Sequence, residues 1–228
     1  MQKQIYKKIV LLSGGLDSTT CLAMAVEKFG LAQIIALNMY YGQRHDREII
    51  SARKVAEHYG VEYQELDLAE IMKFSDCSLL KHSTQKVAHG SYAEQCDGKK
   101  PVATYVPFRN GLFLSVATAF ALSMGADEVW YGAHKDDATG NAYPDCSKEF
   151  IFYMDCAIKE GTANQVKIRA PFADCNKADI VKKGLSLGVP YALTWSCYEG
   201  GEKPCGKCGT CIDRRKAFEA NGLTDPVL

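Results

Sequence analysis

The stretch that most constrains the fold of this chain is residues 13–20, with the sequence Ser-Gly-Gly-Leu-Asp-Ser-Thr-Thr. Residues 9–12 before it form a short apolar run, which is typical of a strand that is buried on both faces. After it, apolar residues recur at helical spacing over residues 21–29, and Gly30 ends the pattern. The chain therefore passes from a strand through a glycine turn into the N-terminus of a helix, where unpaired N–H groups and the helix dipole attract anions.

The loop itself carries suitable donors for a phosphate group. Gly14 and Gly15 let the backbone come close to an anion, because no Cβ atom stands in the way. The hydroxyl groups of Ser13, Ser18 and Thr19 can donate hydrogen bonds to its oxygens. The loop is too short for a Walker-type loop and has no lysine before its second serine, which indicates a different phosphate-binding motif. The alternative is a Gly-Gly turn that only joins a strand to a helix.

The rest of the chain alternates between strand and helix patterns. Strands are predicted over residues 9–12, 34–37, 63–66, 128–131 and 166–169. Helices are predicted from Asp46 to Gly60, from Asn110 as N-cap to Gly125, over residues 147–160 and over residues 176–188. This alternation predicts an α/β fold with a doubly wound, mostly parallel five-stranded sheet that is covered by helices on both faces. Residues 68–104 show no clear pattern beyond a short helix at 69–74, and a connection this long is typical of a lid or a mobile segment.

Four cysteines near the C-terminus form a compact cluster: Cys197, Cys205, Cys208 and Cys211. Four thiolates satisfy a tetrahedral zinc ion, and the glycines between them let backbone N–H groups point at the sulfur atoms. An iron–sulfur cluster shares this ligand set, and a redox pair is a further alternative. Because a closed four-thiolate site has no open coordination position, zinc here should be structural. We expect an α/β domain over residues 1–190 and a small zinc-binding knuckle over residues 191–228.

Composition excludes some classes of function. Lysine plus arginine and aspartate plus glutamate both number 27, so the net charge is zero and no overall basic field exists for nucleic acid. No apolar run reaches membrane-spanning length, and the first residues do not resemble an export signal. We therefore expect a cytoplasmic protein without a nucleic-acid or membrane partner. Because no export signal is expected and four cysteines form one compact cluster, metal binding is a better explanation of the cysteines than a disulfide scaffold.

Two levels of resemblance follow from these motifs. The Ser-Gly-Gly-x-Asp-Ser loop after a first strand resembles the pyrophosphate-binding loop (PP-loop) of the N-type ATP pyrophosphatases, whose fold is the adenine nucleotide alpha hydrolase type. The chain is also similar to the QueC family of 7-cyano-7-deazaguanine synthases, and this similarity rests on residues 41–45, 106–110, 143–146 and 196–198 with the later cysteines. One stretch departs from the family pattern. Residues 132–142 are longer and differently charged, which leaves the contacts of His134, Asp136 and Asp137 open.

The resemblance implies an activity. Members of this family convert 7-carboxy-7-deazaguanine and ammonia to the nitrile precursor of queuosine at the expense of ATP, through an adenylated carboxylate and an amide. It also implies an ATP-binding domain over residues 1–190, zinc in the cysteine cluster, magnesium with the nucleotide and a homodimer. No stretch resembles a glutaminase, so free ammonium is the expected nitrogen source.

The candidate site residues are those that occupy key positions in these motifs. The expected nucleotide-binding residues are Leu12, Ser13, Gly14, Gly15, Leu16, Asp17, Ser18, Thr19 and Thr20. The expected catalytic residues are Asp17, Ser18 and Arg109. Asp17 could bind magnesium or order the loop, and a helix-capping role is the alternative.

The expected substrate-binding residues are Arg44, Arg109, Tyr143 and Asp145. The guanidinium of Arg109 matches the carboxylate of the substrate. An ionised Asp145 could accept two adjacent N–H groups of a guanine-like edge, and Tyr143 could stack on the base. The alternatives are that Asp145 caps the helix from Ser147 and that Arg109 pairs with a neighbouring acid.

Two other functions fit parts of the sequence. A PP-loop tRNA thiolase would adenylate a base and then use a reactive cysteine, although the neutral net charge speaks against a bound tRNA. A non-catalytic ATP-binding sensor would use the zinc knuckle to contact a protein partner. ATP turnover with the deazaguanine substrate separates these two from the synthase.

Overall fold

The structure is a computed structural model that describes residues 7–95 and 100–228. Its described part contains a five-stranded sheet in the order β3-β2-β1-β4-β5, and every pair of neighbouring strands is parallel. The strands are β1 (Lys7–Leu11), β2 (Ile34–Tyr40), β3 (Glu62–Asp67), β4 (Ala126–Trp130) and β5 (Lys167–Arg169). The predicted doubly wound α/β sheet is confirmed.

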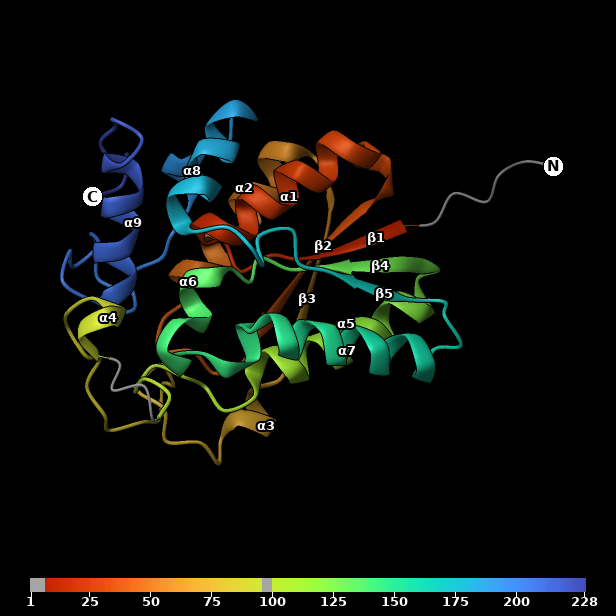
Figure 1. Cartoon of the computed structure of the whole chain (residues 1–228), viewed down its shortest axis with the longest axis horizontal. Coiled ribbons are helices and arrows are strands. Elements are labelled where there is room, and N and C mark those ends of the chain that lie inside the picture. The colour runs from red at the N-terminus through yellow and green to blue at the C-terminus, as the bar shows by residue number, and fades with distance from the viewer. Residues whose placement is uncertain (1–6, 96–99) are drawn as a thin grey trace.

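Helices cover both faces of this sheet. Helices α1 (Leu16–Phe29), α2 (Arg47–Tyr59) and α8 (Lys177–Ser186) lie on one face, and α5 (Arg109–Ser123) and α7 (Lys148–Gly161) lie on the other (Figure 1). The chain builds the sheet outward from β1 to β3 and then from β4 to β5 on the opposite side of β1. Since crossovers between parallel strands are right-handed, this reversal of direction moves the helices to the second face.

The remaining helices are short or lie at one end of the sheet. They are α3 (Ala69–Met72), α4 (Tyr92–Gln95), α6 (Lys135–Ala138) and α9 (Gly209–Glu219), with 3-10 turns at Leu31–Gln33, Thr139–Asn141, Pro144–Cys146 and Tyr191–Leu193. None of the helices that the structure describes has the length and apolar character needed to span a membrane.

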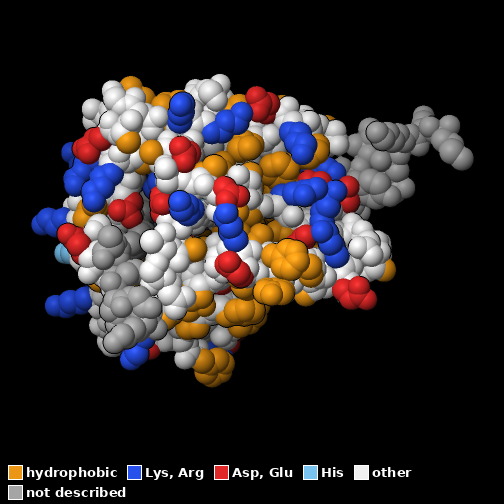
Figure 2. Space-filling view, viewed as in Figure 1, with side chains coloured by type: hydrophobic (Ala, Val, Ile, Leu, Met, Phe, Trp, Pro, Cys, Tyr) orange, Lys and Arg blue, Asp and Glu red, His pale blue; other side chains and the backbone are white. Residues whose placement is uncertain are grey.

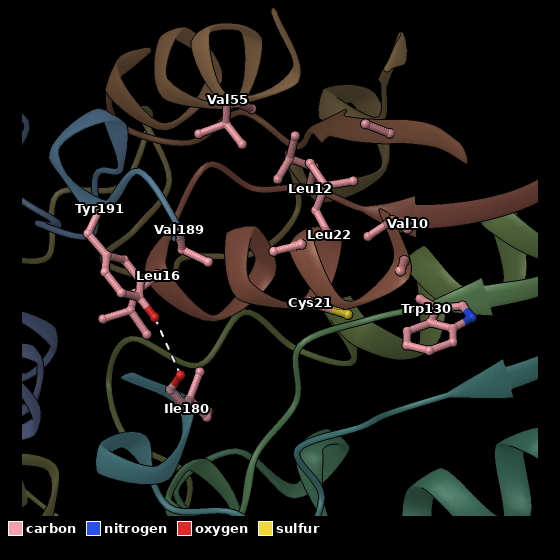
Figure 3. Close-up of a cluster of buried hydrophobic side chains, with 14 of the residues drawn as sticks. Val10, Leu12, Leu16, Cys21, Leu22, Val55, Trp130, Ile180, Val189 and Tyr191 are labelled. Atoms are coloured by element: carbon pink, nitrogen blue, oxygen red, sulfur yellow. Dashed lines mark hydrogen bonds between the residues drawn. The ribbon is translucent and has the colours of Figure 1, made fainter. Parts of the chain in front are cut away.

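The alternation of side chains along β1 creates two cores. Val10 points to the face covered by α1 and belongs to the same buried cluster as Leu22, Val55 and Ile180 (Figure 3). Ile9 points to the other face, against residues of α5 and α7. Both side chains are fully buried, which explains why this strand appears in the sequence as a continuous apolar run.

Two expected helix caps differ from the structure. Asn110 is not the N-cap of α5, because the helix begins at Arg109 and Phe108 occupies the cap position in the left-handed region at φ 54°. The backbone N–H of Asn110 donates to Asp145 Oδ2 at 2.9 Å, so a carboxylate from a distant loop satisfies this helix end. Asp46 precedes α2 but makes no side-chain capping hydrogen bond.

The described residues of the segment 68–104, namely 68–95 and 100–104, contain little regular structure, and some of their backbone groups pair with distant parts of the chain. The N–H of Lys81 donates to Gly42 O at 2.8 Å, and the N–H of Arg44 donates to Leu79 O at 2.9 Å. Further along, the N–H of Gly90 donates to Lys207 O at 3.0 Å. The segment therefore ties the loop after β2 to the C-terminal cysteine region.

Arg214 anchors the C-terminal segment. Its guanidinium is 2% exposed and pairs with Asp225, with Nε 2.6 Å from Oδ2. It also donates to Thr194 Oγ1 at 2.7 Å and to Tyr191 O at 3.2 Å. Buried ionic groups need such full hydrogen bonding. These contacts attach α9 to the turn that follows α8, and the expected division between residues 1–190 and 191–228 stays a prediction.

Candidate active site

A cavity lies at the carboxyl ends of β1, β2 and β4, on both sides of the point where the order of the sheet reverses. Parallel sheets bind ligands at this position, because the loops that leave neighbouring strands separate there. Its walls come from the loop after β1, the end of β2 and the loop after it, the first turns of α2, α5 and α8, and the loop after β4. The C-terminal segment adds Trp195, Ser196, Tyr198 and Thr210. Segments that are far apart in the sequence thus meet in one cavity.

Gly14 forms the tightest packing contact of the phosphate loop. Its φ is +84°, and a Cβ atom built there would lie 2.4 Å from Glu48 O and 2.5 Å from Ala52 N. No side chain fits at this distance. The carbonyl of Gly14 accepts a hydrogen bond from Trp195 N at 2.9 Å, so the loop is fixed between α2 and the C-terminal segment.

The loop hydroxyls are already ordered by one another. Ser18 Oγ accepts from Ser13 N at 3.2 Å and lies 3.0 Å from Ser13 Oγ. Of the nine residues expected to bind nucleotide, those that line the cavity are Leu12, Ser13, Gly15, Asp17 and Ser18. The side chains of Leu16, Thr19 and Thr20 are instead buried in the core below the loop.

Four ionisable side chains form a charge cluster beside the loop. Asp17 Oδ2 lies 3.4 Å from Lys177 Nζ and 3.7 Å from His134 Nε2. His134 Nε2 lies 3.3 Å from Asp137 Oδ2, and the imidazole is 1% exposed. Asp17 Oδ1 is buried and accepts no hydrogen bond from any residue that the structure describes. The cluster places a lysine at the loop even though the loop sequence has none.

The charges of this cluster stabilise one another. Burial opposes ionisation of Asp17, but Lys177 and His134 outweigh it and hold the pKa of this carboxyl well below its usual range. Burial also opposes the charged form of Lys177, yet Asp17 and Asp137 raise the pKa of its ammonium group. The cavity therefore contains a permanent cation that is available to an anionic ligand.

Arg109 occupies another wall of the cavity. Its guanidinium lies 5.4 Å from the centroid of the Tyr41 ring, and Nη1 lies 3.5 Å from the Tyr41 hydroxyl oxygen. Its Nε is buried and donates no hydrogen bond within the described part of the chain. A planar donor with an unused N–H suits a bidentate carboxylate ligand.

The other expected substrate residues do not line this cavity. Arg44 donates to Gln85 O at 2.7 Å, and the Tyr143 hydroxyl lies 2.6 Å from Thr104 Oγ1. Asp145 is 3% exposed and holds the start of α5 through Asn110. It does not cap α7, since Ser147 does so by accepting from Phe150 N at 3.1 Å. Direct substrate contacts by Arg44, Tyr143 and Asp145 stay predictions.

The four cysteines of the C-terminal cluster come together. The sulfur atoms of Cys197, Cys205, Cys208 and Cys211 all lie within 4.8 Å of one another, a spacing that suits a single metal ion. Backbone N–H groups point at them, as expected: Cys205 N donates to Cys197 Sγ at 3.2 Å and Cys208 N to Cys205 Sγ at 3.3 Å. The cluster adjoins Ser196, Tyr198 and Thr210, so it supports one wall of the cavity.

Lys177 and Glu48 line the cavity but were not predicted from the sequence. Lys177 is the first residue of α8, and it lies directly after Asn176, which forms a capping box with Asp179. Its position at the start of a helix that follows β5 was the available signal, because such a residue lies at the carboxyl edge of the sheet. Glu48 is equivalent at the start of α2.

The chain is similar to proteins of one family over nearly its whole length. A family model described as "Queuosine biosynthesis protein QueC" matches residues 7–222. The 7-cyano-7-deazaguanine synthase of Archaeoglobus fulgidus is 44% identical over 223 residues, which cover 97% of this chain and 90% of the relative. That of Psychromonas ingrahamii is 42% identical over 97% of this chain and 96% of the relative.

Solved structures show the same fold at low identity. The U34-tRNA thiolase NcsA from Methanococcus maripaludis, solved with its [4Fe-4S] cluster, aligns with a TM-score of 0.53 and 17% identity over 96% of this chain and 67% of that one. The NH3-dependent NAD synthetase from Campylobacter jejuni aligns with a TM-score of 0.51 and 16% identity over 97% and 77%.

The charge cluster predicts a pH-dependent stability. Burial opposes protonation of His134, but Asp137 and Asp17 outweigh it and raise the pKa of the imidazole. Its stabilising charge is therefore complete below the unfolded pKa of about 6.5 and is lost as the pH rises through the higher folded value. The difference in free energy of unfolding between wild type and His134→Gln should shrink from about pH 6 upward. Denaturant titrations across pH measure it, with the exposed His58→Gln as control. A difference that grows with pH would contradict the assignment.

Proposed function

The chain belongs to the QueC family of queuosine biosynthesis proteins, and we propose that it acts as an ATP-dependent 7-cyano-7-deazaguanine synthase. Its substrates would be 7-carboxy-7-deazaguanine, ammonium and ATP. The observation that carries this proposal is one cavity that holds the Gly-Gly loop, Lys177 and Arg109 together. The loop and Lys177 suit a polyphosphate, and Arg109 suits a carboxylate.

The proposed chemistry uses the same cavity twice. A carboxylate is a poor electrophile until one of its oxygens becomes part of a leaving group, and transfer of AMP from ATP to that oxygen achieves this. Ser13, Gly15 and Ser18 would hold the released pyrophosphate at the N-terminus of α1. Ammonia then displaces AMP and gives the amide. A second adenylation, on the amide oxygen, permits loss of AMP to form the nitrile.

Magnesium fits this site through Asp17. The unbonded Oδ1 of that carboxylate is the donor type that magnesium prefers, and the low pKa of Asp17 keeps it ionised. When bound, magnesium would offset the negative charge of the phosphates. Lys177, 3.4 Å from Asp17, would pair with the phosphates in place of a Walker lysine.

Two alternative functions receive less support. The likeness to the tRNA thiolase is at 17% identity and concerns the fold alone. Cys146 lines the cavity, but burial raises the pKa of its thiol well above the usual value, which makes it a poor nucleophile. A non-catalytic sensor would not need Arg109 opposite the phosphate loop. Formation of the nitrile from ATP, ammonium and 7-carboxy-7-deazaguanine would distinguish the synthase from the thiolase and from the sensor.

We also propose that the protein forms a homodimer in the cytoplasm. Hydrophobic side chains gather on the surface over α5 and α7 (Figure 2). Phe152 and Tyr153 of α7 are 62% and 69% exposed. Exposed apolar groups of this size are typical of a protein–protein contact.

The reaction should yield two AMP and two pyrophosphate for each nitrile. Mass spectrometry of mixtures with ATP, ammonium and 7-carboxy-7-deazaguanine measures all the products, and without ammonium no amide should form. Asp17→Asn should lower turnover by roughly 100-fold, because the proposed magnesium ligand beside the transferring phosphate is lost. Asp174→Asn, on the exposed surface, is the control. Release of ADP and phosphate would refute the proposed cleavage between the α and β phosphates.

Zinc in the cysteine cluster is the second testable part of the proposal. We expect one zinc per chain in purified protein and loss of this zinc in Cys208→Ser. Because the cluster supports the cavity wall and the fold around it, this variant should also have a lower melting temperature and soluble yield. The isolated thiol Cys156 on α7 is exposed, so Cys156→Ser is a matched control. Elemental analysis that finds iron with labile sulfide would reject zinc.

A further inference from the structure

The proposed reaction needs a proton acceptor next to the reacting nitrogen, and the inference here rests on that proposed function. Ammonium has no free electron pair, so it must lose a proton before it can attack the acyl adenylate. In the second round the amide nitrogen must lose both of its protons before the nitrile is complete. A single base close to the acyl carbon would serve both rounds.

Three carboxylates line the cavity within the described part of the chain: Asp17, Glu48 and Asp137. Asp17 pairs with Lys177 and His134, and Asp137 lies 3.3 Å from the His134 imidazole. The Glu48 carboxylate forms neither a hydrogen bond nor an ion pair of 4 Å or less with the residues at 7–95 and 100–228. It is thus the cavity carboxylate that is free to exchange a proton.

Glu48 is also held in a defined place. It is in the first turn of α2, and its backbone packs against Gly14, where a Cβ atom would lie 2.4 Å from Glu48 O. The groups that influence its charge are Arg109 from α5 and Cys197 from the cysteine cluster, and Glu48 in turn influences Tyr41. Glu48 therefore lines the same cavity as the phosphate loop and Arg109, the arginine expected to bind the substrate carboxylate.

The environment of Glu48 suits a base that works near neutral pH. Burial raises the pKa of this carboxyl to about 7, although Arg109 acts in the opposite direction. A base is most effective when its pKa lies near the working pH. Asp17 is held ionised by Lys177 and His134 and would be a weaker base.

We propose that Glu48 is the catalytic proton acceptor for the reacting nitrogen in both rounds. In the first round the Glu48 carboxylate takes a proton from ammonium. Glu48 releases this proton to solvent, the nitrogen electron pair forms the C–N bond, and the C–O bond to AMP breaks with its electron pair leaving on AMP. Glu48 then takes the second proton from the nitrogen. In the second round Glu48 takes one proton from the nitrogen once the amide oxygen is adenylated and releases it to solvent. It then takes the other proton as the C–O bond to AMP breaks and the triple bond forms.

The test compares two nucleophiles in Glu48→Gln. Hydroxylamine is unprotonated near neutral pH, so it needs no base to become nucleophilic and traps the acyl adenylate as a hydroxamate. With ammonium, amide formation should fall about 100-fold or more, whereas hydroxamate formation should fall by less than about tenfold. Pyrophosphate release in the first turnover should persist. Glu57→Gln, the same substitution on the exposed side of α2, should match the wild type in every assay.

Each outcome has a definite meaning. A selective loss with ammonium, which shrinks as higher pH supplies free ammonia, supports the assignment. Equal losses with ammonium and hydroxylamine would overturn it, because Glu48 would then act in adenylation or in folding. Unchanged amide and nitrile formation would overturn it as well. Failure of the wild type to form amide, hydroxamate or nitrile would instead refute the proposed function.

Discussion

The site depends on how closely the chain packs at Gly14. The backbone of α2 lies so near this residue that no Cβ atom fits, and the N–H of Trp195 donates to its carbonyl. A strand–turn–helix unit, a second helix and the C-terminal segment are thereby fixed to one another. A phosphate and α2 must both come close to the backbone of this loop, and glycine permits this because it has no Cβ atom. Glu48 and Ser196 enter the cavity as a consequence.

The charges around this turn explain how a loop without its own lysine can suit a polyphosphate. Lys177 arrives from the first turn of α8, and its charge is balanced by Asp17 until an anion competes for it. Arg109 arrives from α5 on the other side of the cavity. Two cations at separate walls match a reaction that brings together a nucleotide and a carboxylate. Four thiolates would leave no open coordination position on a bound metal ion. The cysteine cluster therefore contributes to the shape of the cavity wall.

Much of the fold was predictable because its signals are local. The strands at 9–12 and 34–37 are apolar throughout since both faces are buried, and the glycine loop identifies the strand–helix turn. Features that depend on tertiary contacts were not predictable. Asn110 looks like a helix cap, but Asp145 supplies the acceptor from another loop. Lys177 and Glu48 lie in ordinary helix starts, and only the sheet topology brings them together. Residues 81 and 90 pair with distant backbone, and such pairing leaves no periodic pattern in the sequence.

The central claim is that this cavity transfers AMP to an oxygen of the substrate. The most direct measurement follows the oxygens of a carboxydeazaguanine labelled with ¹⁸O in both carboxylate positions. If the carboxylate and then the amide are adenylated, each label leaves on AMP, and mass spectrometry should find one ¹⁸O in each of the two AMP molecules formed per nitrile. Label in inorganic phosphate or pyrophosphate, with AMP unlabelled, would contradict the account, because the substrate oxygen would then have attacked a different phosphorus atom.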